Sequence, residues 1–81
     1  MRDTRTLRDL RHEMHLSRKE AAEAIGISLS YLDNIEYGRR LPSLQLVPAL
    51  SDVYWEDWGT IVQAALNTYY GGTYDPPEKH P

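Results

Sequence analysis

The segment SRKEAAEAIGISLSYLDNIEYG, residues 17–38, decides the fold of this chain. It contains two short stretches in which apolar residues have helical spacing, the first followed by Gly26 and the second by Gly38. Glycine adopts the left-handed backbone conformation that often ends a helix, because it has no Cβ atom to clash. The segment therefore predicts two helices joined by a sharp turn, which is the layout of a helix-turn-helix.

Capping residues at both helix starts support this layout. Ser17 is followed three residues later by Glu20, the spacing of a capping box, in which hydroxyl and carboxylate bind free backbone N–H groups. Ser28 stands at the start of the second stretch, where a serine hydroxyl is a favoured cap. We therefore expect helices over about residues 18–25 and 29–36.

The rest of the chain predicts three more helices and no strand. Apolar residues recur with helical spacing over about residues 6–15, 44–53 and 58–68. Pro48 lies inside the second of these patterns, and proline lacks an N–H group and clashes with the preceding turn. We expect a kink there, or a helix that becomes regular only from Pro48. The expected fold class is all-α, a compact arrangement of five helices.

Length and composition limit the architecture and the location. The 81 residues have room for one domain, which we assign to residues 1–70, followed by a tail rich in proline and glycine at residues 71–81. The chain has no cysteine, which excludes disulfides and thiolate metal sites. No apolar run reaches membrane length, and the first residues lack the apolar stretch of a signal peptide. We expect a cytoplasmic protein that does not contact a membrane.

The net charge is −3, but it is unevenly distributed. Residues 1–40 carry 8 Arg or Lys and 7 Asp or Glu, whereas residues 41–81 carry 1 and 5, which gives net charges of +1 and −4. A nucleic-acid-binding protein needs a basic face, not a basic molecule. The first half can supply such a face, and the acidic second half should weaken indiscriminate binding.

Several short motifs spread over most of the chain match one known pattern. The matching residues are Leu7, Leu10, Arg11, Leu16, Ser17, Glu20, Ala21, Ala22, Ile25, Gly26, Ile27, Ser28, Ile35, Glu36, Tyr37, Gly38, Pro42 and Ser43. This pattern, over roughly residues 6–66, resembles the lambda-repressor-like, or Cro/repressor, helix-turn-helix family. The resemblance implies a five-helix DNA-binding domain in which the helix at residues 29–36 enters the major groove of double-stranded DNA.

The resemblance also implies which side chains read bases. The groove-facing positions hold Leu29, Ser30, Asp33 and Asn34. Asn34 can bind adenine, Asp33 can accept from cytosine, Leu29 can contact a thymine methyl group, and Ser30 suits several bases. Family members often have Gln, Arg or Lys here, and this chain has none. This departure from the family pattern argues for weaker sequence readout, but it does not affect the expected fold.

Candidate phosphate contacts surround these positions. They are Arg18, Ser28, Tyr31, Arg39 and Arg40. Arg18 opens the first helix of the motif, where free backbone N–H groups also attract phosphate. The alternative for the arginines is solvated surface charge, and the alternative for Tyr31 is packing.

Two further groups of residues are expected to have structural roles, one as an ion pair and the other as a dimer interface. In the family, the residues at Arg11 and Glu36 form an ion pair that joins the first helix to the end of the third. A dimer interface is expected at an aromatic and apolar group, because aromatic residues are enriched at interfaces. Its candidate members, for which core packing is the alternative, are Tyr54, Trp55, Trp58, Ile61 and Val62.

The preferred functional hypothesis is a sequence-specific transcriptional regulator, a repressor, that binds a two-fold symmetric operator as a homodimer. Phage repressors, restriction-modification controllers and antitoxins all fit. The alternative is a protein–protein interaction module with the same fold and no specific DNA binding. His12 and His15 lie three residues apart, but zinc needs three or four ligands and no third is near in sequence. We expect no metal, cofactor, small-molecule ligand or catalytic activity.

Overall fold

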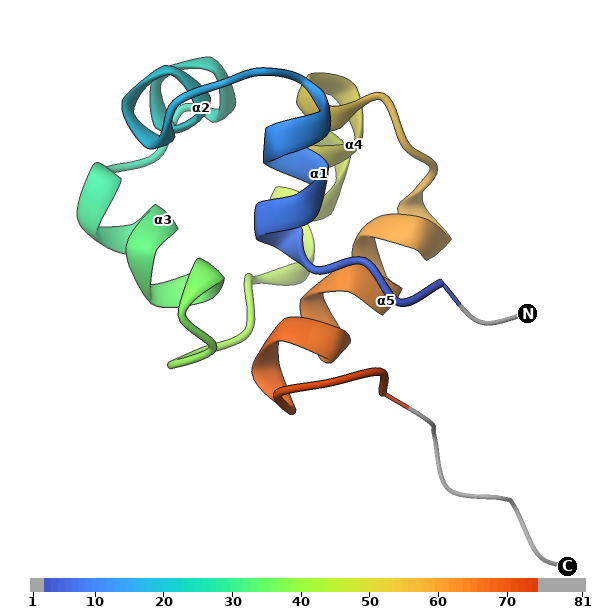
Figure 1. Cartoon of the computed structure of the whole chain (residues 1–81). Helices are drawn as coiled ribbons and strands as arrows, with labels where there is room; N and C mark the ends of the chain where they lie inside the picture. Colours follow the sequence, from blue (N-terminus) through green and yellow to red (C-terminus); the bar gives the residue numbers. More distant parts are fainter. Residues whose placement is uncertain (1–2, 75–81) are drawn as a thin grey trace, which may run out of the picture.

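Five α-helices and one 3₁₀ turn form residues 3–74, the part of the chain that the computed structural model describes, and no strand occurs there (Figure 1). The elements are α1 (Leu7–Glu13), α2 (Arg18–Ile25), α3 (Leu29–Glu36), the 3₁₀ turn η1 (Leu44–Leu46), α4 (Val47–Tyr54) and α5 (Trp58–Tyr69). The expected all-α, five-helix fold class is confirmed. Most of the predicted tail at residues 71–81 lies outside the described residues.

The capping residues act as predicted. The Ser17 hydroxyl accepts from the N–H of Glu20 at 3.0 Å, and the N–H of Ser17 donates to the Glu20 carboxylate at 2.9 Å. The Ser28 hydroxyl accepts from the N–H of Tyr31 at 3.0 Å. Gly26 ends α2 with a φ of 90°, a conformation that an L-residue rarely adopts. Local side-chain chemistry thus fixes the limits of α2 and the start of α3.

The region around Pro48 differs in part from the expectation. The chain forms the 3₁₀ turn η1 first, so the expected helix start at residue 44 was three residues too early. Regular α-helix starts at Val47, which confirms within one residue the expected alternative of a helix that is regular only from Pro48. Pro48 then lies in the first turn of α4, where a helix does not need the N–H group that proline lacks. Ser43 makes no side-chain cap; its N–H instead donates to the Tyr31 hydroxyl at 3.2 Å.

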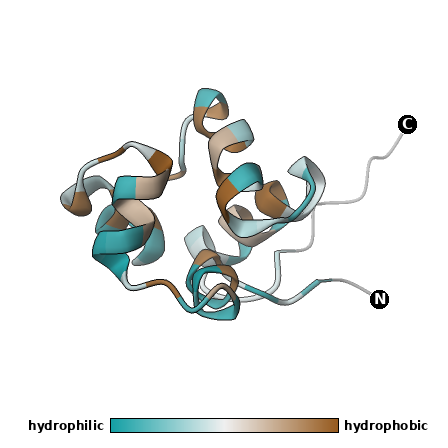
Figure 2. Ribbon diagram, turned by 90° about the horizontal axis from the view of Figure 1, so that it is seen from above, coloured by the Kyte–Doolittle hydropathy of each residue, from teal (hydrophilic) through white to brown (hydrophobic). Residues whose placement is uncertain are grey.

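The core draws on every α-helix. α2 packs against α4 and α3 packs against α5, while α1 contacts α3, α4 and α5 (Figure 1). Figure 2 shows hydrophobic and hydrophilic residues distributed around each helix. The small side chains of Ala21 and Ala22 are buried on α2, which packs against both α3 and α4. No helix in residues 3–74 has the length and apolar character needed to cross a membrane. The buried hydrophobic residues are Leu7, Leu10, Ala21, Ala22, Ile25, Leu32, Ile35, Val47, Leu50, Tyr54, Ile61, Ala64 and Ala65.

A buried asparagine joins the two ends of the described chain to α5. Asn67 is fully buried, and its amide nitrogen donates to the carbonyl groups of Asp3 and Arg5, each at 2.9 Å. Its carbonyl oxygen accepts from the N–H of Tyr74 at 2.6 Å and from the Gln63 side chain at 2.8 Å. Because every polar atom of this amide is bonded, burial of Asn67 is compatible with a stable core.

Candidate nucleic-acid interface

One side of α3 is available to a ligand. Leu32 and Ile35 are buried and fix the orientation of the helix, while Leu29 and Ser30 on the other side are exposed. Two further residues on that side, Asp33 and Asn34, are half-buried. The part of α3 to which sequence analysis assigned base readout is therefore exposed at its first two residues and partly covered at the other two.

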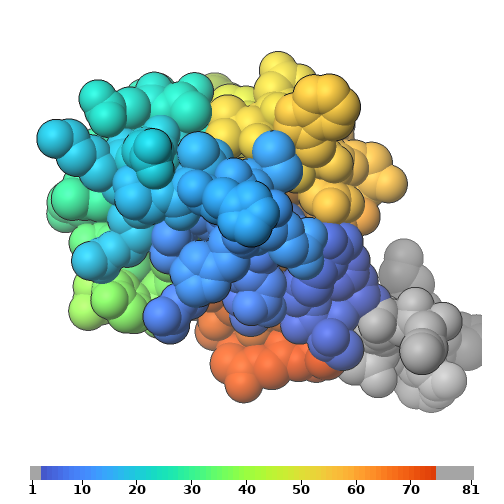
Figure 3. Space-filling model, turned by 45° about the horizontal axis from the view of Figure 1, so that its top comes forward, coloured from blue at the N-terminus to red at the C-terminus, as the bar shows by residue number. Residues whose placement is uncertain are grey.

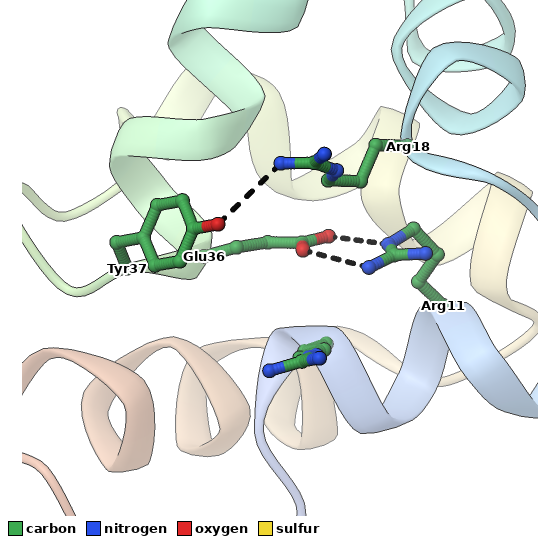
Figure 4. A pocket seen from close by; sticks show the side chains of 5 residues that line it. Arg11, Arg18, Glu36 and Tyr37 are labelled. Carbon is green, nitrogen blue, oxygen red and sulfur yellow. Dashed lines mark hydrogen bonds and ion pairs between the residues drawn. The ribbon is translucent and has the colours of Figure 1, made fainter.

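Arg18 and Asp33 link the start of α2 to the middle of α3. Nη1 of Arg18 donates to Oδ1 of Asp33 at 3.0 Å. The Tyr37 hydroxyl lies 3.5 Å from the same nitrogen, a contact that Figure 4 marks. The structure thus brings together a residue predicted to bind phosphate and one predicted to read a base. Figure 3 shows the α2 and α3 segments side by side on the molecular surface.

Two more arginines lie after α3 and pack on tyrosine rings. The Arg39 guanidinium lies 5.0 Å from the centre of the Tyr37 ring, and its Nη1 donates to Oδ1 of Asn34 at 3.2 Å. The Arg40 guanidinium lies 4.9 Å from the centre of the Tyr31 ring. Cation–π contacts of this kind orient the arginines while leaving their N–H groups available to an anion.

Arg11 and Glu36 form a two-point ion pair beneath this surface. Nε and Nη2 of Arg11 donate to the two carboxylate oxygens of Glu36 at 2.7 and 3.0 Å (Figure 4). Nη1 of Arg11 donates to the carbonyl of Leu16 at 2.9 Å. The hydrogen bonds to Glu36 raise the pKa of Arg11, and both side chains are almost fully buried. The pair therefore joins α1 to the end of α3.

A basic pocket adjoins the ion pair. It has a volume of about 210 Å³ and combines three guanidinium groups with one carboxylate. Sequence analysis did not single out one of its members, Arg8. The signal was available, because Arg8 precedes Arg11 by three residues on α1 and helical residues three apart share a face. The lining residues are Arg8, Arg11, Arg18, Glu36 and Tyr37.

The predicted dimer residues divide into two groups. Tyr54 and Ile61 are 2% and 0% exposed, so their assignment to an interface was wrong: both pack in the domain's own core. Burial also raises the pKa of the Tyr54 hydroxyl. The other three predicted residues, Trp55, Trp58 and Val62, are exposed.

An apolar pocket of about 140 Å³ lies next to the exposed residue Val62. It is formed where the loop after α3 and the start of α4 meet α5. The exposed side chains of Leu41 and Leu44 extend this apolar surface. The lining residues are Leu41, Pro42, Leu44, Val47, Val62, Ala65 and Leu66.

Comparison with known proteins agrees with this arrangement. The sequence model of a family described as a helix-turn-helix domain matches residues 4–56, more than half of the chain. This chain belongs to the helix-turn-helix family. The match contains α1 to α4, including the α2–α3 motif, and the predicted Cro/repressor type of helix-turn-helix is confirmed.

Two relatives of this helix-turn-helix chain illustrate the family. The ImmF control region 10 kDa protein of Bacillus phage phi105 is 33% identical over 69 residues, which are 85% of this chain and 77% of the phage protein. The HTH-type transcriptional regulator DdrOP3 of Deinococcus deserti is 44% identical over 48 residues, which are 59% of this chain and 37% of that regulator. No solved structure matches the chain significantly.

Proposed function

We propose that this protein is a transcriptional repressor that binds a two-fold symmetric operator in double-stranded DNA as a homodimer. The observation that carries the proposal is the exposed side of α3 with arginines on both sides of it, Arg18 before and Arg39 and Arg40 after. A helix of this kind fits the major groove, and guanidinium groups beside it meet the phosphates. The names of the two relatives, a phage control-region protein and a transcriptional regulator, support a regulatory role.

Base readout falls to the four residues on the exposed side of α3. Ser30 is exposed and its hydroxyl can donate to or accept from a base edge. Leu29, 44% exposed, offers an apolar contact for a thymine methyl group. Asn34 and Asp33 each already bind an arginine in the free protein, so a base must replace or share those contacts.

Phosphate binding falls to the arginines and to helix starts. Arg39 and Arg40 are exposed and are oriented by tyrosine rings. Ser28 keeps a hydroxyl hydrogen to donate, because its oxygen is the acceptor in the α3 cap. The Tyr31 hydroxyl likewise accepts from Ser43 and can still donate to phosphate. These groups supply affinity and register, and α3 supplies sequence preference.

The proposed dimer forms through the exposed apolar surface of α5 and the neighbouring loop. Trp58 and Val62 are one helical turn apart on α5, and Leu44, which is 82% exposed, lies at the same apolar pocket as Val62. Large apolar residues grouped on a small domain are typical of an interaction surface. A second copy of the chain would cover them and set the two α3 helices about 34 Å apart, one turn of DNA.

The test is the salt dependence of binding to a duplex selected from random DNA. Three arginine contacts in each subunit neutralise about six phosphates, so the logarithm of the affinity should fall against the logarithm of salt concentration with a slope of about −5. Arg39→Ala should weaken binding to every duplex and flatten the slope, because it removes a counterion-releasing contact. Titration of a labelled duplex at several salt concentrations measures both.

The contradicting result is affinity for the selected duplex that barely changes between low and moderate salt. The protein–protein interaction module would then take the place of the operator-binding proposal. The net charge of −4 on residues 41–81 is the observation that favours that second function.

A further inference from the structure

The structure points to Asp33 as a residue that sets specificity by restraining binding to DNA that is not the operator. We infer that in the free protein the Asp33 carboxylate binds the Arg18 guanidinium and so occupies the position that a DNA phosphate would take. The carboxylate releases Arg18 where a base pair donates a hydrogen bond to Asp33 instead. This inference rests on the proposed function, and it deepens it by assigning a coupling between base readout and phosphate contact.

The geometry allows Asp33 and a DNA phosphate to compete for the guanidinium group of Arg18. Arg18 is the first residue of α2, and its Nη1 atom faces both Oδ1 of Asp33 at 3.0 Å and the Tyr37 hydroxyl at 3.5 Å. Asp33 and Tyr37 are four residues apart, so they lie on one side of the α3 end. The Arg18 side chain remains 47% exposed, so an incoming phosphate can reach it.

The fold does not need this pair. Exposed ion pairs contribute little to stability, and α2 already packs against α3 through the buried hydrophobic core. The cost of the Arg18–Asp33 pair falls on DNA binding instead. A phosphate that approaches Arg18 must displace a carboxylate and then lie next to its negative charge.

Base identity can remove that cost. The amino group of cytosine in the major groove donates to a carboxylate, so a correctly placed cytosine gives Asp33 a new partner and frees Arg18 for phosphate. On other sequences no base donates to Asp33, so Asp33 stays paired with Arg18. The contact between Arg18 and phosphate is then not made. Wild-type protein should therefore make about one fewer phosphate contact per subunit on non-operator DNA, which lowers its salt slope by about 0.9 for each subunit.

The experiment compares the variants Asp33→Asn and Asp52→Asn with the wild-type chain. Asp52 is exposed on α4, so its substitution changes the net charge equally but leaves Arg18 paired. The affinities for the selected operator and for an unrelated duplex are measured by titration across salt concentrations. Compared with the wild-type chain, Asp33→Asn should bind the unrelated duplex severalfold more tightly and with a steeper salt slope. It should therefore discriminate less between the operator and unrelated DNA. Asp52→Asn should change neither the affinity for the unrelated duplex nor its salt slope.

Arg18→Ala completes a double-mutant cycle. In the wild-type chain, Arg18→Ala should change the affinity for unrelated DNA little. In the Asp33→Asn chain it should abolish the gain in affinity for unrelated DNA, because only in that chain is Arg18 free to bind phosphate. Asp33→Ala should behave as Asp33→Asn does, and equal urea midpoints should show that the fold is unchanged.

Two results overturn the inference. If Asp33→Asn gains no more than Asp52→Asn, or if Arg18→Ala costs the same in both chains, Asp33 does not restrain Arg18. Steep, salt-dependent operator binding in the same experiment would leave the proposed function standing. If no variant shows salt-dependent binding to any duplex, both the inference and the proposed function fail.

Discussion

Glu36 balances the charge of Arg11, a buried arginine beneath the candidate interface. Its carboxylate is 4% exposed and binds Arg11 through both oxygens. Glu36→Gln removes the charge and leaves the Arg11 guanidinium buried without its counterion, which should lower the free energy of unfolding by about 3–5 kcal/mol. Urea denaturation measures this loss.

Two comparisons separate charge from packing in that experiment. Glu23→Gln, an equal change on the exposed side of α2, should leave the urea midpoint nearly unchanged. The double variant Arg11→Met, Glu36→Leu should recover much of the loss, because an apolar pair needs no counterion. A Glu36→Gln chain as stable as Glu23→Gln would mean that the pair does not support the fold.

At the scale of single residues, the sequence could predict chemistry but not burial. Arg11 and Glu36 were recognisable from the family pattern, and the structure brings them together. Tyr54 and Ile61 were assigned to a dimer surface, yet both are core residues, because burial depends on which helices pack over them. Asn67 gave no signal, since the two carbonyl groups to which its amide nitrogen donates, those of Asp3 and Arg5, lie at the other end of the chain.

The ends of helices show the opposite case, since they depend on local chemistry. Thr6, Ser17, Ser28 and Asp57 all accept a backbone N–H bond at the start of a helix. Such contacts span three residues, so the sequence contains all the information that decides them. The 3₁₀ turn before α4 is different, because its geometry depends on how Pro48 and the preceding loop pack on the domain.

Gly26 and Gly38 provide a matched pair for a prediction about elements. Both have positive φ, but a Cβ atom on Gly26 would meet nothing within 4 Å, whereas one on Gly38 would lie 2.7 Å from the Thr68 carbonyl on α5. Gly26→Ala should cost about 1–2 kcal/mol of unfolding free energy from backbone strain alone. Gly38→Ala should cost about 1–3 kcal/mol more, because α5 must also move away.

Thermal or urea unfolding of the two alanine variants tests this difference. If both variants lose the same free energy of unfolding, Gly38 does not pack tightly against α5. A larger loss for Gly38→Ala would identify Gly38 as the point at which the helix-turn-helix is joined to α5.

At the scale of the whole molecule, the proposed dimer depends on one exposed surface. Trp58 and Tyr70 are both 60% exposed and lie near opposite ends of α5, so they allow a matched test. Trp58→Glu should convert the dimer to monomer and weaken operator binding, because it sets a charge in an apolar interface. Tyr70→Glu should leave both properties unchanged.

Sedimentation of the three chains at micromolar concentration measures the oligomeric state. A wild-type monomer at high micromolar concentration would contradict the dimer, as would equal effects of the two substitutions. Sequence analysis could propose this surface from its tryptophans, but a chain read alone cannot show which aromatic residues its own core will use.

The central claim is that the exposed side of α3 reads DNA sequence. The most direct measurement is selection of bound sites from random DNA by the wild-type chain and by the double variant Ser30→Ala, Asn34→Ala. Ser30 is the cleaner of the two positions, because Asn34 also binds Arg39. The variant should lose preference at specific base pairs of each half-site, by about 1–3 kcal/mol per base pair, while its affinity for unrelated DNA persists. Selection of the same sequences by both chains would contradict the claim.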